Sequence, residues 1–84
     1  MRKSHKRDDD IYEIIATNIR YYRKEAKITQ GELALRSNYS HEYLRRIEAP
    51  HGTKYISINT LVKIADALEI NVELLLKGIS NGGK

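Results

Sequence analysis

The sequence predicts an all-α protein, a compact domain of five helices. Apolar and polar residues nowhere alternate for the length of a β-strand. Apolar residues instead recur at the three- and four-residue intervals of a helix face. The 84 residues suit one small domain, which we expect to span residues 9–77. A mobile basic tail is expected at 1–8 and a mobile tail at 78–84, because neither end carries a packing pattern.

The first helix is predicted over residues 10–26. Asp9 or Asp10 can cap its start, where acidic side chains also suit the positive end of the helix dipole. We expect one face of this helix to lie on the core. That face consists of Ile11, Ile15, Ile19, Tyr22 and Ala26.

A repeated pattern predicts where the other helices begin. An apolar residue is followed by Ser, Thr or Asn, and a second apolar residue comes four positions after the polar one. This is the spacing of an N-cap with a hydrophobic staple, and it predicts helices at 29–37, 40–48, 57–68 and 71–77. Thr29 and Glu32 also have the spacing of a capping box. The four matches are Ile28-Thr29 with Leu33, Tyr39-Ser40 with Leu44, Ile56-Ser57 with Leu61, and Ile70-Asn71 with Leu75.

The connections between these helices are also readable. Only Asn38 and Tyr39 separate the second helix from the third, and Asn tolerates the left-handed conformation that ends a helix. Two short helices joined by so tight a turn cross steeply, as in a helix-turn-helix. Pro50 and Gly52 mark the longer loop at 49–56. The fourth helix is expected to bury Ile58, Leu61, Ile64, Ala65 and Leu68.

Composition narrows the possible functions. A net charge of +4, concentrated in the first two thirds of the chain, favours nucleic acid or an anionic surface as partner. The chain has no cysteine, and its histidines lack ligand spacing, so we expect no disulfide and no metal. Neither a nucleophile beside a base nor a glycine-rich phosphate loop is evident, so we expect no enzyme, no cofactor and no small-molecule ligand. No apolar run approaches the roughly 18 residues of a membrane span.

From Ile19 to Leu76 the sequence resembles the lambda-repressor-like helix-turn-helix family, also called the Cro or Xre type. The second helix opens with Thr29-Gln30, and the third ends with Ile47-Glu48. Residues 57–65, SINTLVKIA, match the family's fourth helix. Asn38 stands where the family usually has Gly, which the left-handed tolerance of Asn allows. The resemblance implies a DNA-binding transcriptional regulator, a repressor or controller protein, that acts in the cytoplasm on nucleoid DNA.

The resemblance further implies that the third helix enters the major groove. Arg46 can bond to guanine O6 and N7, and its alternatives are solvation or a phosphate contact. His41 can either donate to guanine or accept from an amino group, or it can meet only phosphate or water. Glu42 can accept from a cytosine amino group, or it can pair with an arginine of its own helix. The expected base-contacting residues are His41, Glu42, Arg45 and Arg46.

Four other side chains are expected at DNA phosphates, which set the position of the protein but not its sequence preference. Gln30 matches the family's phosphate-binding glutamine at a helix N-terminus. Tyr43 has partial core packing as its alternative, and Lys54 has simple solvation. The basic run at 2–7 can follow DNA as an arm, but a tail neutralised by Asp8–Asp10 is the interpretation we favour. The expected phosphate-contacting residues are Gln30, Ser40, Tyr43 and Lys54.

Glu48 requires a different explanation, because it closes the third helix where the dipole disfavours an anion. In the family's pattern its partner is an arginine seven residues before the glutamine, here Arg23. We expect a structural salt bridge between them.

The resemblance implies double-stranded operator DNA as the partner and a homodimer on a palindrome. We expect the dimer contact in the fifth helix, with the loop at 49–56 and the tail as alternatives. The alternative is a protein-binding module of the same fold, such as an antitoxin or adaptor, which would lack the outward cations and Gln30. The apolar residues expected at the dimer contact are Val72, Leu74, Leu75 and Leu76.

Overall fold

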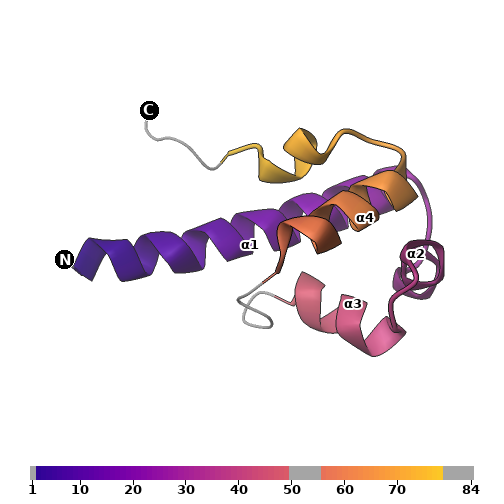
Figure 1. Cartoon of the computed structure of the whole chain (residues 1–84), viewed down its shortest axis with the longest axis horizontal. Helices are drawn as coiled ribbons and strands as arrows, with labels where there is room; N and C mark the ends of the chain where they lie inside the picture. Colours follow the sequence, from indigo (N-terminus) through magenta and orange to yellow (C-terminus); the bar gives the residue numbers. More distant parts are fainter. Residues whose placement is uncertain (1, 50–55, 79–84) are drawn as a thin grey trace.

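The computed structural model describes residues 2–49 and 56–78, with side chains from Ile11 onward. This part of the chain holds four α-helices and one 3-10 helix, and it contains no strand, which confirms the all-α prediction. Figure 1 shows α1 along the length of the molecule, with the other elements packed around its second half. The elements are α1 (Arg2–Glu25), α2 (Gln30–Ser37), α3 (His41–Glu48), α4 (Ile58–Leu68) and η1 (Val72–Leu76).

The start of α1 differs from the prediction. The helix begins at Arg2, so Asp9 and Asp10 lie inside it and do not cap it. No Gly or Pro in residues 2–10 interrupts the helix, and the acidic residues are compatible with its interior. Residues 2–8, which we assigned to a tail, are therefore part of α1. The predicted C-terminal tail after Gly78 lies outside the described residues.

The predicted caps of α2, α3 and α4 are present. The hydroxyls of Thr29, Ser40 and Ser57 each accept a hydrogen bond, at 3.0 Å in every case, from the backbone N–H three residues later. The reciprocal half of the capping box is replaced, because the Glu32 carboxylate accepts from Arg36 Nη2 at 3.1 Å. Asn38 ends α2 with φ 66° and ψ 36°, the left-handed conformation that the sequence predicted.

The fifth helix is the main error in the fold prediction. Residues 72–76 form a short 3-10 helix, and the side chain of Asn71 makes no capping bond. The Leu74 N–H donates to the Asn71 carbonyl at 3.0 Å, the three-residue spacing of a 3-10 turn. Asn18 Nδ2 donates to the carbonyls of Leu75 at 2.9 Å and Lys77 at 3.0 Å, which ties this segment to α1. These tertiary bonds satisfy carbonyls at the end of the chain segment without a longer helix.

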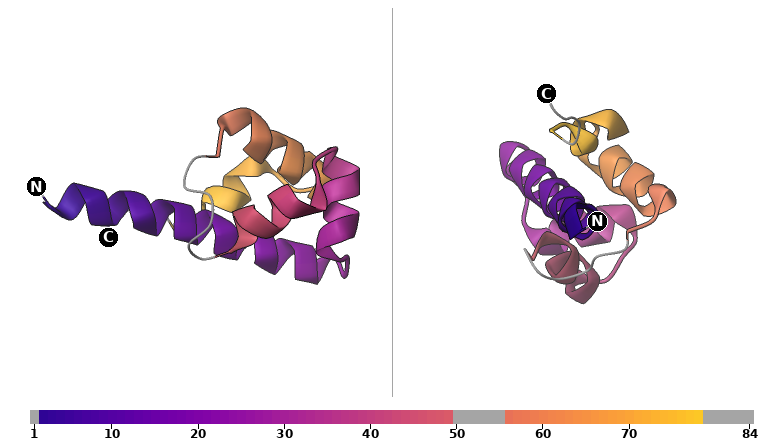
Figure 2. Two further views of the ribbon diagram at one scale, coloured as in Figure 1. Left: turned by 90° about the horizontal axis from the view of Figure 1, so that it is seen from below. Right: turned by 90° about the vertical axis from the view of Figure 1, so that its left-hand side faces the viewer.

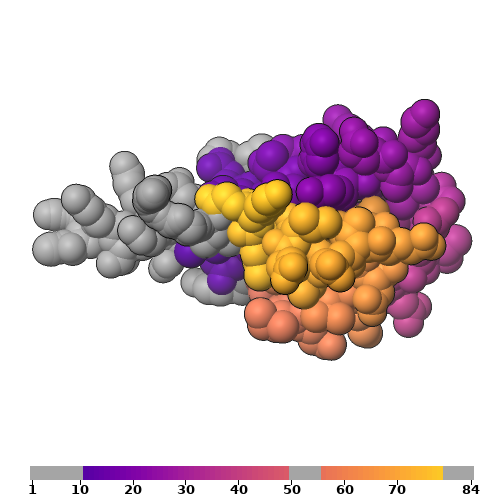
Figure 3. Space-filling view, turned by 90° about the horizontal axis from the view of Figure 1, so that it is seen from above, coloured from indigo at the N-terminus to yellow at the C-terminus, as the bar shows by residue number. Residues whose placement is uncertain are grey.

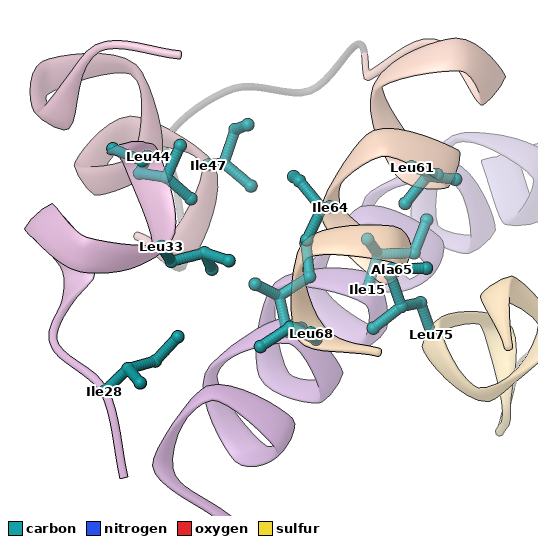
Figure 4. Packing of buried hydrophobic residues seen from close by; sticks show 12 residues of the cluster. Ile15, Ile28, Leu33, Leu44, Ile47, Leu61, Ile64, Ala65, Leu68 and Leu75 are labelled. Atoms are coloured by element: carbon teal, nitrogen blue, oxygen red, sulfur yellow. The ribbon is translucent and has the colours of Figure 1, made fainter. Parts of the chain in front are cut away.

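All five elements contribute to one hydrophobic core, shown in Figure 4. Leu44 and Ile47 point inward from α3, as predicted. Ile58 was expected in the core but is 70% exposed. The inward side of the first turn of α4 is taken by Thr60, whose hydroxyl accepts from Tyr39 Oη and Ser57 Oγ at 3.0 Å each. The largest fully buried side chains are Ile19, Leu33, Leu44, Ile64 and Leu75.

The core separates two faces of the molecule. In Figure 3, η1 (yellow) lies across α1 and α4 on one side. Figures 1 and 2 place α3 on the opposite side of the body, where η1 does not reach it. The outer surface of α3 is therefore left open by the rest of the described chain.

Candidate nucleic-acid interface

α2 and α3 have the arrangement of a helix-turn-helix. The Tyr39 N–H donates to the Ala34 carbonyl at 2.9 Å, which closes the turn directly after α2. In Figure 1 α2 is seen nearly end-on while α3 runs across the view, so the two helices cross steeply. The buried residues of α3 fix its inner side to the core, and its outer side is exposed. The exposed side carries His41, Glu42, Arg45 and Arg46.

The two arginines of this exposed side differ in their contacts. Arg45 Nη2 lies 2.9 Å from Glu42 Oε1, and both side chains are well exposed, at 60% and 64%. The structure thus places Glu42 against Arg45, one of the arrangements that the sequence left open. Arg46 forms no hydrogen bond or ion pair with any residue in 11–49 or 56–78. Its guanidinium is therefore the free cation of α3 within the described part of the chain.

Glu48 and Arg23 form the expected ion pair. Arg23 Nε lies 2.7 Å from Glu48 Oε2, and Arg23 Nη2 lies 3.0 Å from Glu48 Oε1, so the contact is bidentate. The side chains are 12% and 1% exposed, respectively. Arg20 Nη1 also donates to the Glu48 carbonyl. The end of α3 is therefore held to α1 through both the side chain and the backbone of Glu48.

Gln30 lies within this network, which the sequence did not predict. Its Nε2 donates to Glu48 Oε1 at 3.0 Å, and its Oε1 lies 3.3 Å from His41 Nε2. One N–H of the Gln30 amide remains for another acceptor. The only signal in the sequence was the position of Gln30 at the first residue of α2. From that position the Gln30 amide reaches both His41 at the start of α3 and Glu48 at its end.

The aromatic side chains beside α3 connect the turn to α4. The rings of Tyr39 and Tyr43 have centroids 4.9 Å apart. Tyr39 Oη bonds to Thr60, and Lys63 Nζ lies 5.5 Å from the Tyr39 ring centroid. Tyr43 is half-buried, so its ring combines packing with a position near the exposed face. Sequence reasoning placed Tyr39 in the turn before the third helix and Lys63 in the family's fourth-helix motif, but it missed the contact between them.

Of the remaining expected site residues, Ser40 is exposed and its hydroxyl caps α3. Lys54 lies outside the described residues, as does His51. Within the described ranges there is no group of His, Asp or Glu able to hold a metal ion. No helix of the same residues is long and apolar enough to cross a membrane.

Gly31 gives a stability prediction within this site. A Cβ added there would lie 3.7 Å from His41 Nδ1 and 3.8 Å from Thr29 Oγ1, which are ordinary van der Waals distances. Glycine in a helix costs conformational entropy relative to alanine. We expect Gly31→Ala to raise the free energy of unfolding by about 0.5 kcal/mol, measured by urea denaturation. A loss of stability would show that the space beside His41 is tighter than these distances.

The comparisons with known proteins agree with this geometry. A family model described as helix-turn-helix matches residues 19–75, more than half of the chain. The chain therefore belongs to the helix-turn-helix family, in agreement with the lambda-repressor-like (Cro/Xre) resemblance of its motifs.

The chain is also similar to control protein C.SmaI of Serratia marcescens. The two are 34% identical over 74 residues, which cover 86% of each chain. No solved structure gives a significant match. The family and this relative together identify a DNA-binding transcriptional regulator.

Proposed function

We propose that this protein is a sequence-specific regulator that occupies a palindromic operator as a dimer, with α3 in the major groove. One observation carries the proposal: α3 is fixed to the core on one side and exposes polar and basic side chains on the other. A helix held in this way can enter the groove without rearranging the domain. The relative from Serratia marcescens is named a control protein, which supports a controller role.

Arg46 is proposed as the principal base contact. It has no partner among the described residues, so reading a guanine does not require an ion pair to break. Arg45 and Glu42 approach DNA as a pair. Together they offer an acceptor and a donor at neighbouring positions, which suits a C·G pair better than an isolated arginine does.

The proposed phosphate contacts lie at helix N-termini. Gln30 retains one amide N–H at the start of α2, where the helix dipole also favours an anion. Ser40 is the N-cap of α3, and Tyr43 lies in its first turn. Lys54 remains a proposal from the sequence, because its position lies outside the described residues.

The structure changes the proposed dimer contact. Leu75 is fully buried, so it is not available to a partner, which contradicts its predicted role. Val72 and Leu76 pack partly against the core as well. Ile58 and Val62 lie one turn apart on α4 and are 70% and 37% exposed. We therefore propose that the two-fold contact includes this apolar strip of α4.

Ile58→Glu tests this contact. Because a two-fold axis repeats each substitution, two carboxylates would meet or lie close together in the dimer. We expect the variant to sediment as a monomer at concentrations where the wild type is a dimer. Leu35→Glu is the matched control, because Leu35 lies on α2 and is 81% exposed. This variant should still sediment as a dimer. An unchanged dimer in Ile58→Glu would move the interface elsewhere.

Selection of bound duplexes from random DNA tests the function itself. We expect an enriched sequence with two-fold symmetry and half-sites about one turn (~34 Å) apart. A module of the same fold that binds only a protein partner would enrich no sequence. An enriched site without symmetry would retain sequence-specific binding and reject the dimeric arrangement.

A further inference from the structure

Four side chains form a continuous series of polar contacts from α1 to the first residue of α3. Arg23 donates two hydrogen bonds to Glu48, Gln30 Nε2 donates to Glu48 Oε1 at 3.0 Å, and Gln30 Oε1 lies 3.3 Å from His41 Nε2. Glu48 is 2% exposed, whereas His41 is exposed on the face proposed to meet DNA. These contacts therefore connect the buried charge of Glu48 to the ring of His41, which lies on the face proposed to meet DNA.

The direction of each hydrogen bond follows from the chemistry of Glu48. A carboxylate held by the guanidinium of Arg23 is an acceptor only, so the group of Gln30 that faces it must be the NH2. The Gln30 carbonyl oxygen then faces His41 and can only accept. His41 Nε2 must therefore carry a hydrogen. In the neutral ring this leaves Nδ1 as the acceptor.

We infer that Glu48 and Gln30 are positioning residues that fix the tautomer of His41 and thereby its base preference. The consequence for base preference rests on the proposed DNA-binding function. It is that Nδ1 of neutral His41 accepts a hydrogen bond from an amino group. The adenine N6 and cytosine N4 amino groups are the major-groove donors, whereas guanine presents only the acceptors O6 and N7. The inference decides between the two base contacts that the sequence left open for His41, donation to guanine and acceptance from an amino group.

Glu48→Gln should keep this arrangement. Two donors, Arg23 Nη2 and Gln30 Nε2, face the Oε1 position, whereas only Arg23 Nε faces the Oε2 position. The amide oxygen of the new side chain is therefore expected at the Oε1 position, where it accepts both hydrogen bonds. Gln30→Leu instead removes the acceptor that faces His41 Nε2, so the neutral ring should become a mixture of both forms.

Nitrogen NMR of 15N-histidine-labelled full chain tests this directly, at alkaline pH where imidazoles are neutral. His41→Ala identifies the signals of His41. We expect the Nε2–H form in the wild type and in Glu48→Gln, and a mixture of both forms in Gln30→Leu. Glu32→Gln, the same change on an exposed residue of α2, is the matched control and should leave the tautomer unaltered.

The inference is overturned if wild-type His41 carries its hydrogen mainly on Nδ1, or if folded Gln30→Leu retains the wild-type tautomer, because a ring fixed by Gln30 must become a mixture of both forms without it. Selection from random DNA adds a second readout at the base pair whose preference His41→Ala removes. There the wild type and Glu48→Gln should select A or C, and Gln30→Leu should lose part of that preference. If no sequence is enriched, the proposed function fails while the NMR result still stands.

Discussion

Arg23→Ala is expected to lower the free energy of unfolding by about 3–5 kcal/mol. The substitution leaves the Glu48 carboxylate, whose side chain is 1% exposed, without its cation. Gln30 would still donate one hydrogen bond, but an uncharged amide cannot balance a buried charge. Since small domains are stable by roughly 5–15 kcal/mol, this loss is a large fraction of the total. Urea denaturation followed by circular dichroism measures it.

Arg36→Ala is the matched control for that experiment. Arg36 pairs with Glu32 at 3.1 Å, but these side chains are 42% and 45% exposed, so solvent screens the pair. We expect a loss of less than about 1 kcal/mol. Equal small losses in both variants would show that the Arg23–Glu48 pair does not hold α3 to α1.

Arg46→Ala is expected to weaken operator binding by about 1–3 kcal/mol per half-site, which corresponds to roughly 5- to 150-fold. The reason is that the unpaired guanidinium of Arg46 is proposed to bond to guanine. Binding to a scrambled duplex should fall much less, because only a nonspecific charge is lost there. Fluorescence titration of both duplexes at one salt concentration measures the two effects.

The control for Arg46 again uses an exposed arginine. Arg36→Ala removes one positive charge from α2 and should weaken binding to both duplexes by a similar small factor. If Arg46→Ala also reduced the affinity for both duplexes equally, Arg46 would be a phosphate contact. The base contacts of α3 would then have to come from His41 and the Glu42–Arg45 pair.

Local chemistry explains why most of the fold was predictable. The hydroxyl caps of Thr29, Ser40 and Ser57 act within three residues, so the sequence contains all the information that they need. The left-handed turn at Asn38 is equally local. The start of α1 was missed because an aspartate that can cap a helix is also tolerated inside one. The 3-10 form of η1 and the exposure of Ile58 depend on tertiary packing, which periodicity does not contain.

The candidate site divides in the same way. Helix periodicity separated the inward residues of α3 from the outward ones, and the family resemblance supplied the pairing of Arg23 with Glu48. The hydrogen bonds of Gln30 were not predictable, because they require the packing of α2 against α3 to bring Glu48, Gln30 and His41 together. The partner of Glu42 was left between two arginines three and four residues away, and side-chain geometry selected Arg45.

The central claim is that α3 reads DNA sequence, and the ratio of two affinities tests it most directly. The duplex enriched by selection and a scrambled duplex of the same composition are titrated with the wild-type protein at about 0.15 M salt. We expect the enriched duplex to bind at least about 10³-fold more tightly, as specific regulators do. Equal affinities for the two duplexes would contradict the claim and leave only nonspecific attraction to phosphate.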